Sequence, residues 1–104
     1  ELRKKFREIE KFPAVTRDIA MIMREEISHE RIWRAIQEPR EPLLESVKLF
    51  DVFSGGELGP ARKSLAYRLT YRDRSRTLTN EEVNAAHAKI RERLRRDLGA
   101  ELRE

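Results

Sequence analysis

Residues 63–94 read KSLAYRLTYRDRSRTLTNEEVNAAHAKIRERL, a strand pattern joined to a helix pattern through a basic loop. In the first part, every second residue from Leu65 to Tyr71 is leucine or tyrosine, and the residues between them are small or polar. A period of two residues is typical of a strand with one buried face and one solvated face. The stretch 63–72 therefore predicts a strand whose leucine and tyrosine side chains face a core.

The second part of this stretch predicts a long helix. Thr79 and Glu82 have the spacing of a capping box, in which each side chain bonds the backbone N–H of the other residue. Apolar residues then recur every three or four positions, as in an amphipathic helix, and Gly99 is a suitable C-terminal stop. The predicted buried stripe consists of Val83, Ala86, His87, Ile90, Leu94 and Leu98.

The rest of the chain completes an α+β pattern. The predicted order is β-α-β-β-α-β, the ferredoxin-like arrangement, in which two helices cover one face of an antiparallel sheet. The other predicted elements are strands over 17–23, 43–53 and 100–103, a helix over 29–37 with Ser28 as its N-cap, and a glycine-rich connection over 54–61.

Length and composition limit what the chain can be. Its 104 residues suffice for one domain with one modest core, and we expect a lead-in segment over 1–12 and the domain over 13–104. The chain begins at Glu1 rather than Met, which predicts a segment of a longer protein. The absence of cysteine excludes disulfides, zinc–thiolate sites and thiol nucleophiles. The same absence fits the cytoplasmic location that we expect. No apolar run is long enough to span a membrane, so we expect no membrane partner.

A basic stripe over residues 62–76 is the main functional signal. It holds six Lys or Arg against one Asp, a local charge of +5, whereas the whole chain carries +4. Such a stripe can hold nucleic-acid phosphates, although solvated basic surfaces are also common. Alternation places part of it on the open face of the sheet beside an aromatic ring, a combination that binds unpaired bases. The candidate RNA-binding residues are Lys48, Phe50, Arg68 and Arg72, which we expect to face solvent on the sheet, and Arg62, Lys63, Arg74 and Arg76 at its edges.

The sequence contains no convincing catalytic or metal site. His29 and His87 are the two histidines, and neither belongs to a cluster with metal-ligand spacing. We expect His87 to be a core or boundary residue, His29 to lie at the surface, and Trp33 to anchor its helix to the sheet. The glycine-rich loop before Lys63 lacks the preceding glycine of a P-loop and leads into a strand. The chain by itself is therefore not expected to be an enzyme.

Four blocks of sequence, in order, resemble a known family. The resemblance is to the ferredoxin-fold anticodon-binding domain at the C-terminal end of the beta subunit of bacterial phenylalanyl-tRNA synthetase, and it covers residues 12–103. The blocks are FPAVTRDIA (12–20), LFDVF (49–53), KSLAYRLTYR (63–72) and TLTNEEVNAAHAKI (77–90), followed by a closing LGAELR (98–103).

The resemblance implies a specific function. A domain of this family contacts the anticodon stem-loop of tRNAPhe and positions the tRNA, far from the catalytic centre. The implied parent is a heterotetramer of two alpha and two beta chains that joins phenylalanine to tRNA with ATP and Mg²⁺, its chemistry being in the alpha subunit. The domain itself would hold no cofactor. The alternative that stays open is a ferredoxin-like regulatory or protein-docking module that does not bind RNA.

Overall fold

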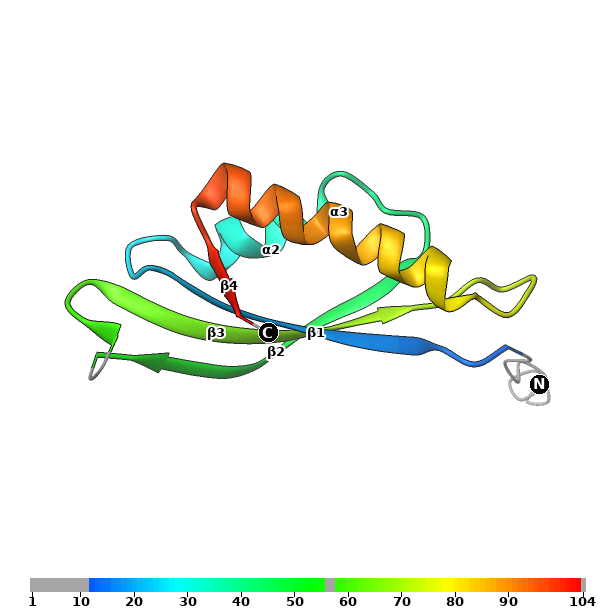
Figure 1. Ribbon diagram of the computed structural model, residues 1–104, viewed down its shortest axis with the longest axis horizontal. Coiled ribbons are helices and arrows are strands. Elements are labelled where there is room, and N and C mark those ends of the chain that lie inside the picture. Colours follow the sequence, from blue (N-terminus) through cyan, green and yellow to red (C-terminus); the bar gives the residue numbers. More distant parts are fainter. Residues whose placement is uncertain (1–11, 56–57, 104) are drawn as a thin grey trace, which may run out of the picture.

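The computed structural model describes residues 12–55 and 58–103, so that most of the expected lead-in segment lies outside the described residues. A four-stranded antiparallel sheet forms one layer, and two helices lie across one of its faces (Figure 1). This confirms the predicted α+β fold and the order β-α-β-β-α-β. The elements are β1 (Val15–Arg24), α2 (His29–Gln37), β2 (Leu44–Ser54), β3 (Arg62–Tyr71), α3 (Asn80–Leu98) and β4 (Glu101–Arg103).

The strand order in the sheet is β2-β3-β1-β4, which places β3 and β1 at its centre. Strand β3 pairs with β1 along its whole length, from Arg62 opposite Arg24 to Tyr71 opposite Val15. The short β4 pairs with β1 only at Ala20–Ile22. Strand β2 forms the other edge and pairs with β3 from end to end. Both edges of β3 are therefore paired in a fixed register.

Local signals at the ends of the two helices match their predicted bounds. The Ser28 hydroxyl accepts a hydrogen bond from the backbone N–H of Arg31, which caps α2. At α3 the predicted capping box forms, because the side chains of Thr79 and Glu82 each accept from the other residue's backbone N–H. The helix ends at Gly99, whose φ of 67° lies in the left-handed region that glycine adopts without strain.

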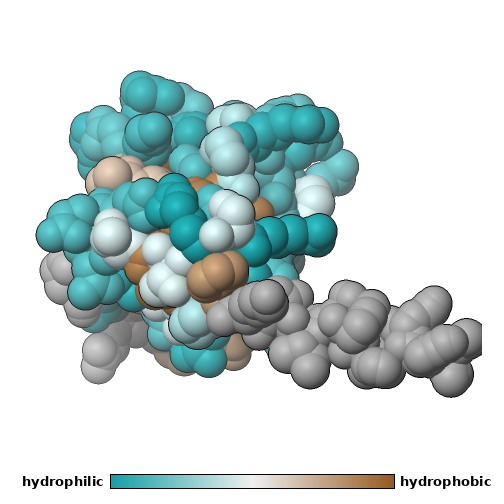
Figure 2. All heavy atoms as spheres, turned by 90° about the vertical axis from the view of Figure 1, so that its right-hand side faces the viewer, coloured by the Kyte–Doolittle hydropathy of each residue, from teal (hydrophilic) through white to brown (hydrophobic). Residues whose placement is uncertain are grey.

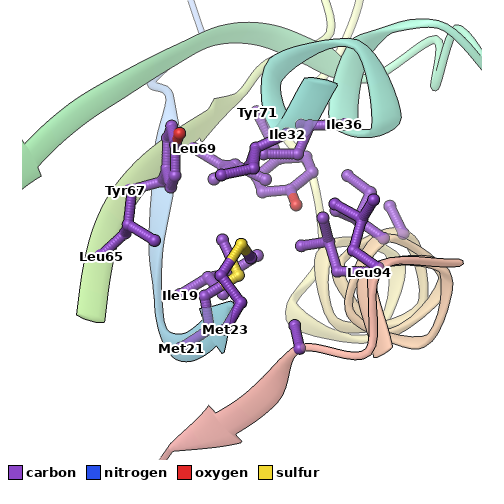
Figure 3. Close-up of a cluster of buried hydrophobic side chains, with 14 of the residues drawn as sticks. Ile19, Met21, Met23, Ile32, Ile36, Leu65, Tyr67, Leu69, Tyr71 and Leu94 are labelled. Carbon is purple, nitrogen blue, oxygen red and sulfur yellow. The ribbon is translucent and has the colours of Figure 1, made fainter. Parts of the chain in front are cut away.

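The core fills the space between the sheet and the helices (Figure 3). Leu69 of β3 and Ile19 of β1 are fully buried, and they face helical side chains that are equally inaccessible. Burying one such side chain contributes roughly 1.5–3 kcal/mol of hydrophobic free energy. Every second residue of β3 from Leu65 to Tyr71 belongs to this core, as the alternation predicted. The labelled core side chains are Ile19, Met21, Met23, Ile32, Ile36, Leu65, Tyr67, Leu69, Tyr71 and Leu94.

Candidate nucleic-acid interface

A bulge in β2 determines what the open face of the sheet presents. Leu49 pairs with Tyr67, but the next pair is Asp51 with Ala66, so Phe50 is an extra residue between them. A bulge of this kind places two consecutive side chains on one side and shifts the alternation of the strand by one position. The residues of β2 beyond Phe50 therefore face the opposite way from what strict alternation would give.

The shift brings a second aromatic ring to the open face. Phe53 pairs with Ser64, whose neighbour in the chain, Leu65, points into the core. Because paired residues of antiparallel strands share a face, Phe53 lies on the same side as Phe50, and Val52 turns toward the helices. The exposed fractions are 48% for Phe50 and 54% for Phe53. Two large rings thus remain half-accessible on the face that no described helix covers.

Three strands meet in a cluster around Arg68. The Nε and Nη2 atoms of Arg68 donate to Oδ1 and Oδ2 of Asp18 at 2.9 and 3.1 Å. The guanidinium carbon of Arg68 lies 4.9 Å from the centroid of the Phe50 ring. Hydrogen bonding from Arg68 holds the pKa of the Asp18 carboxyl below its usual value, and the same contact raises the pKa of Arg68. The two charged side chains stay about half-exposed.

Next to this cluster the two central strands carry small side chains on the open face. Ala20 of β1 pairs with Ala66 of β3, and Ser64 lies two residues before Ala66 on the same face. Larger side chains flank them, because Asp51 of β2 pairs with Ala66 and Ile22 of β1 pairs with Ser64. The exposed carboxylate of Asp51 therefore also belongs to the open face.

Lys63 is not part of this surface, which corrects the sequence-based prediction. It has the same alternation as Leu65 and therefore points to the helix side of β3, where it is buried. Its ammonium group donates a hydrogen bond to the backbone carbonyl of Ile27, in the connection between β1 and α2. A buried ammonium with a structural partner is not available to a phosphate.

Arg72 also departs from the prediction, because its side chain is only 20% exposed. Its Nε atom donates to Glu45 at 2.8 Å, and its Nη1 atom donates to the carbonyl oxygen of Phe12 at 2.9 Å. The backbone N–H of Arg72 donates to Leu43. These contacts tie the end of β3 to the start of β2 and to the segment that leads into β1, so Arg72 has a structural role.

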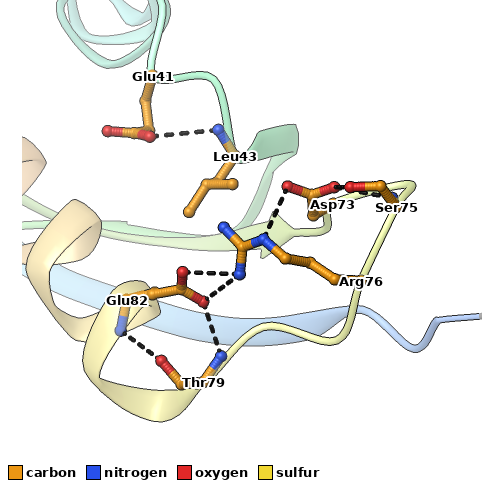
Figure 4. A network of polar contacts seen from close by, with 7 residues as sticks. All are labelled: Glu41, Leu43, Asp73, Ser75, Arg76, Thr79 and Glu82. Atoms are coloured by element: carbon orange, nitrogen blue, oxygen red, sulfur yellow. Dashed lines mark hydrogen bonds and ion pairs between the residues drawn. The ribbon is translucent and has the colours of Figure 1, made fainter.

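The other four predicted cations differ in whether an acidic side chain pairs with them. Arg62 forms an ion pair with Glu101 of β4 at 2.8 Å. Arg76 donates to Glu82 at 2.7 Å and lies 3.7 Å from Asp73, in a network that includes the α3 capping box (Figure 4). The side chains of Lys48 and Arg74 have no hydrogen-bond or ion-pair partner in the described parts of the chain.

Basic and acidic side chains also lie close together at the end of the molecule where β1 begins and the β3–α3 loop lies. This end is hydrophilic over most of its surface, with small hydrophobic areas (Figure 2). A polar hollow there is lined by Glu45, Arg72, Asp73 and Arg74, together with residues 42–44. The basic stripe of the sequence is therefore not one continuous basic surface, because acidic side chains interrupt it.

The helix side of the β2 edge carries a different surface. Trp33 of α2 is 48% exposed, so it does not anchor its helix in the core as the sequence suggested. With His29, Glu30, Leu49 and Tyr67 it lines a shallow, mainly apolar notch. Nδ1 of His29 lies 3.3 Å from the Tyr67 hydroxyl, and burial raises the pKa of that tyrosine to about 12.

Comparison with known proteins agrees with this geometry. Residues 10–103 match the family model described as the ferredoxin-fold anticodon binding domain. The chain belongs to this family. Similar proteins include the phenylalanine–tRNA ligase beta subunits of Symbiobacterium thermophilum, 48% identical over 98 residues, and Clostridium tetani, 44% identical over 102 residues. That of Anaeromyxobacter dehalogenans is 45% identical over 98 residues. The predicted resemblance is confirmed.

These alignments cover nearly all of this anticodon-binding domain but a small part of each relative. They include 94%, 98% and 94% of this chain, respectively, and 11%, 13% and 12% of the relatives. The chain therefore spans about an eighth of the length of the curated proteins it matches.

His87 is the buried histidine of the anticodon-binding domain. Its Nδ1 atom lies 2.8 Å from the Tyr71 hydroxyl. Burial lowers the pKa of His87, and the nearby charges of Arg91 and Arg17 lower it further, while Asp18 acts in the opposite direction. The prediction of a core or boundary histidine is confirmed.

The described part of the chain contains neither a metal-binding cluster nor a membrane-spanning helix. Within residues 12–55 and 58–103, no three His, Cys, Asp or Glu side chains are grouped to hold a metal ion. In the same ranges, neither helix has the length and apolar character needed to cross a bilayer.

Sequence reasoning missed two parts of this surface, namely Phe53 and the pairing of Arg68 with Asp18. Strict alternation from Lys48 assigns Phe53 to the wrong face, and the bulge that corrects it arises from pairing with β3. Asp18 is 50 residues away from Arg68, and neither residue's surroundings in the sequence indicate the other. The signal that was available concerned Lys63, because its alternation with Leu65 already predicts a buried position.

Proposed function

We propose that this domain binds the anticodon stem-loop of tRNAPhe on the open face of its sheet, as part of a phenylalanine–tRNA ligase beta subunit. The observation that carries the proposal is the pair of half-exposed rings, Phe50 and Phe53, on a sheet face that also presents Lys48 and Arg68. The family description and the names of the relatives support the same assignment.

The chemistry of the face fits an unpaired loop better than a duplex. Bases in an anticodon loop can be splayed from their stack, and proteins bind such bases by stacking them on aromatic rings or guanidinium planes. Each stacked base contributes about 1–3 kcal/mol, with little dependence on which base it is. Lys48, which has no partner among the described residues, is free to contact a phosphate.

In the parent enzyme the domain would act by positioning the tRNA. Holding the anticodon end fixes where the acceptor end of the tRNA lies and helps to identify the tRNA. We assign aminoacylation with ATP and Mg²⁺ to the alpha subunit of an alpha2–beta2 tetramer in the cytoplasm. The domain by itself then takes no part in the reaction at the acceptor end and binds neither ATP nor Mg²⁺.

The test is a titration of the 104-residue chain with a synthetic tRNAPhe anticodon stem-loop, and with one whose anticodon is changed, at two salt concentrations. We expect binding that prefers the cognate loop and weakens with salt, with a log–log slope of about −0.7 for each phosphate contacted in a single strand. Equal binding to both loops would leave only non-specific attraction, and no binding at low salt would contradict the proposal for the isolated domain.

A pair of aromatic variants tests which face binds. Phe53→Ala should weaken binding about tenfold or more, because a base loses its stacking partner. Trp33→Ala is the matched control, since Trp33 is similarly exposed but lies on the helix side. Both variants should keep the melting temperature of the wild type within a few degrees. If Trp33→Ala weakens binding and Phe53→Ala does not, the open face is not the RNA surface.

The alternative of a protein-docking module rests on the notch around Trp33. That notch is mainly apolar and lies beside the β2 edge, where Val52 is 49% exposed. Docking there would depend weakly on salt, whereas RNA binding depends on it strongly. Salt dependence and the response to Trp33→Ala therefore separate the two functions.

A further inference from the structure

We propose that the guanidinium of Arg68, rather than the ring of Phe50, is the surface on which one unpaired base of the bound RNA stacks. The base, Arg68 and Phe50 would then form a three-layer stack. This inference rests on the proposed RNA-binding function and adds to it the role of one residue. It differs from the simpler reading in which the aromatic ring holds a base and the arginine holds a phosphate.

The first argument is that Arg68 already occupies the ring. Its guanidinium carbon lies 4.9 Å from the centroid of Phe50, so a base cannot use that face of the ring unless Arg68 moves away. Guanidinium groups are planar, and they stack on aromatic rings and on bases alike. The second face of the guanidinium thus extends the platform that Phe50 begins.

The second argument is that Asp18 fixes the position of this platform. Arg68 uses Nε and Nη2 for two hydrogen bonds to the two carboxylate oxygens of Asp18. Two parallel bonds from a planar fork restrain a guanidinium more than a single bond does. Arg68 therefore stays on the open face without the entropic cost of ordering a free side chain at the moment of binding.

The third argument concerns charge. The carboxylate of Asp18 offsets most of the attraction that Arg68 would exert on a phosphate, because opposite charges this close cancel at a distance. Lys48 pairs with Arg68 in the sheet register and has no partner among the described residues. Phosphate contact is then the role of Lys48, and the role that suits Arg68 is contact through its planar face.

The experiment compares Arg68→Lys with wild type in titrations of the tRNAPhe stem-loop at two salt concentrations. Lysine keeps the positive charge but has no planar group, so the stacking proposal predicts binding about tenfold weaker with an unchanged salt slope. The matched control is Arg95→Lys, because Arg95 makes the same two-point contact with Glu92 but lies on α3. That control should bind like wild type.

Asp18→Ala gives the sharper second test. Removing a negative charge from the RNA face should strengthen binding if only electrostatics mattered. If Asp18 instead holds the platform, Asp18→Ala weakens binding by several-fold, although the net charge has become more positive. A thermal melt of each variant shows that the fold is retained.

The outcomes are distinct. The stack is supported if the wild-type domain binds the stem-loop and both Arg68→Lys and Asp18→Ala bind it more weakly. Full binding by Arg68→Lys with loss only in Arg68→Ala identifies a phosphate contact and overturns the inference, while the proposed function stands. Tighter binding by Arg68→Ala means that Arg68 covers the ring and must leave, which also overturns it. Absence of wild-type binding overturns both proposals.

Discussion

The two faces of the sheet differ in how completely folding buries their side chains. On the helix side, Leu65, Tyr67, Leu69 and Tyr71 of β3 are at most 2% exposed. Among the described residues, no buried side-chain nitrogen or oxygen there lacks a hydrogen-bond partner. On the open side, two phenylalanine rings stay half-exposed.

This difference separates stability from binding within single strands. The covered face supplies the hydrophobic free energy of folding, because its apolar area is removed from water. The open face retains apolar and planar area that folding leaves accessible, which is the area a ligand can still bury. Substitutions on adjacent residues of one strand should therefore affect different properties.

The largest effect should come from Leu69→Ala on the covered face. Leu69 is fully buried, and its truncation should lower the free energy of unfolding by about 2–5 kcal/mol, since it leaves a cavity in the core. Thr70→Ala, one residue further along, changes the open face and should cost less than about 1 kcal/mol. Urea unfolding followed by circular dichroism measures both. Equal losses would contradict the separation of the two faces.

A smaller effect on stability should distinguish Lys63 from Lys48, two cations that composition alone cannot tell apart. Lys63→Met should lower the free energy of unfolding by about 1–3 kcal/mol, because the carbonyl of Ile27 loses its hydrogen-bond donor in a buried site. The salt slope of stem-loop binding should not change. Lys48→Met should have the reverse effect, with unchanged stability and a slope reduced by about 0.7 if Lys48 contacts one phosphate.

These two lysine variants should be measured by urea unfolding and by titration at several salt concentrations. A loss of salt slope in Lys63→Met would show that its ammonium reaches the RNA, and would return it to the binding surface.

The smallest effect is the pH dependence of stability that comes from His87 on the covered face. Its pKa in the folded state lies below the usual value of about 6.5, so the unfolded chain binds a proton first as pH falls. The stabilising contribution of neutral His87 is complete above about pH 6.5 and decreases as pH falls toward the folded-state pKa. We expect the melting temperature to decrease by a few degrees between pH 7.5 and 5.5.

His87→Asn should remove most of this slope and lower the melting temperature at neutral pH. The four carboxyl groups whose pKa values are lowered, those of Asp18, Asp73, Glu82 and Glu92, do not add to the slope in this window. An unchanged slope in His87→Asn would assign the pH dependence to other groups.

The fold could be predicted because its signals are local. The alternation from Leu65 to Tyr71 identified the covered face of β3, and Thr79 with Glu82 identified the start of α3. Each pattern depends on residues within one element, so it can be read before the elements are assembled.

The binding surface was less predictable because its features depend on long-range pairing. The bulge at Phe50 exists only because β2 pairs with β3, and it moves Phe53 to the open face. Arg72 looked solvent-facing, but Glu45 and the carbonyl of Phe12 hold it in place. A count of basic residues does not distinguish cations that the fold uses from cations that are free.

The bulge also affects how homologous sequences should be compared. Loss of the Phe50 codon would restore strict alternation and leave Val52 and Phe53 on the faces that they now occupy, because Phe50 is the unpaired residue of the bulge. A relative that lacks one residue here would therefore lose the ring of Phe50 and keep that of Phe53 on the open face. A one-residue alignment gap at this place thus marks the presence or absence of the bulge rather than a different facing of the rest of the strand.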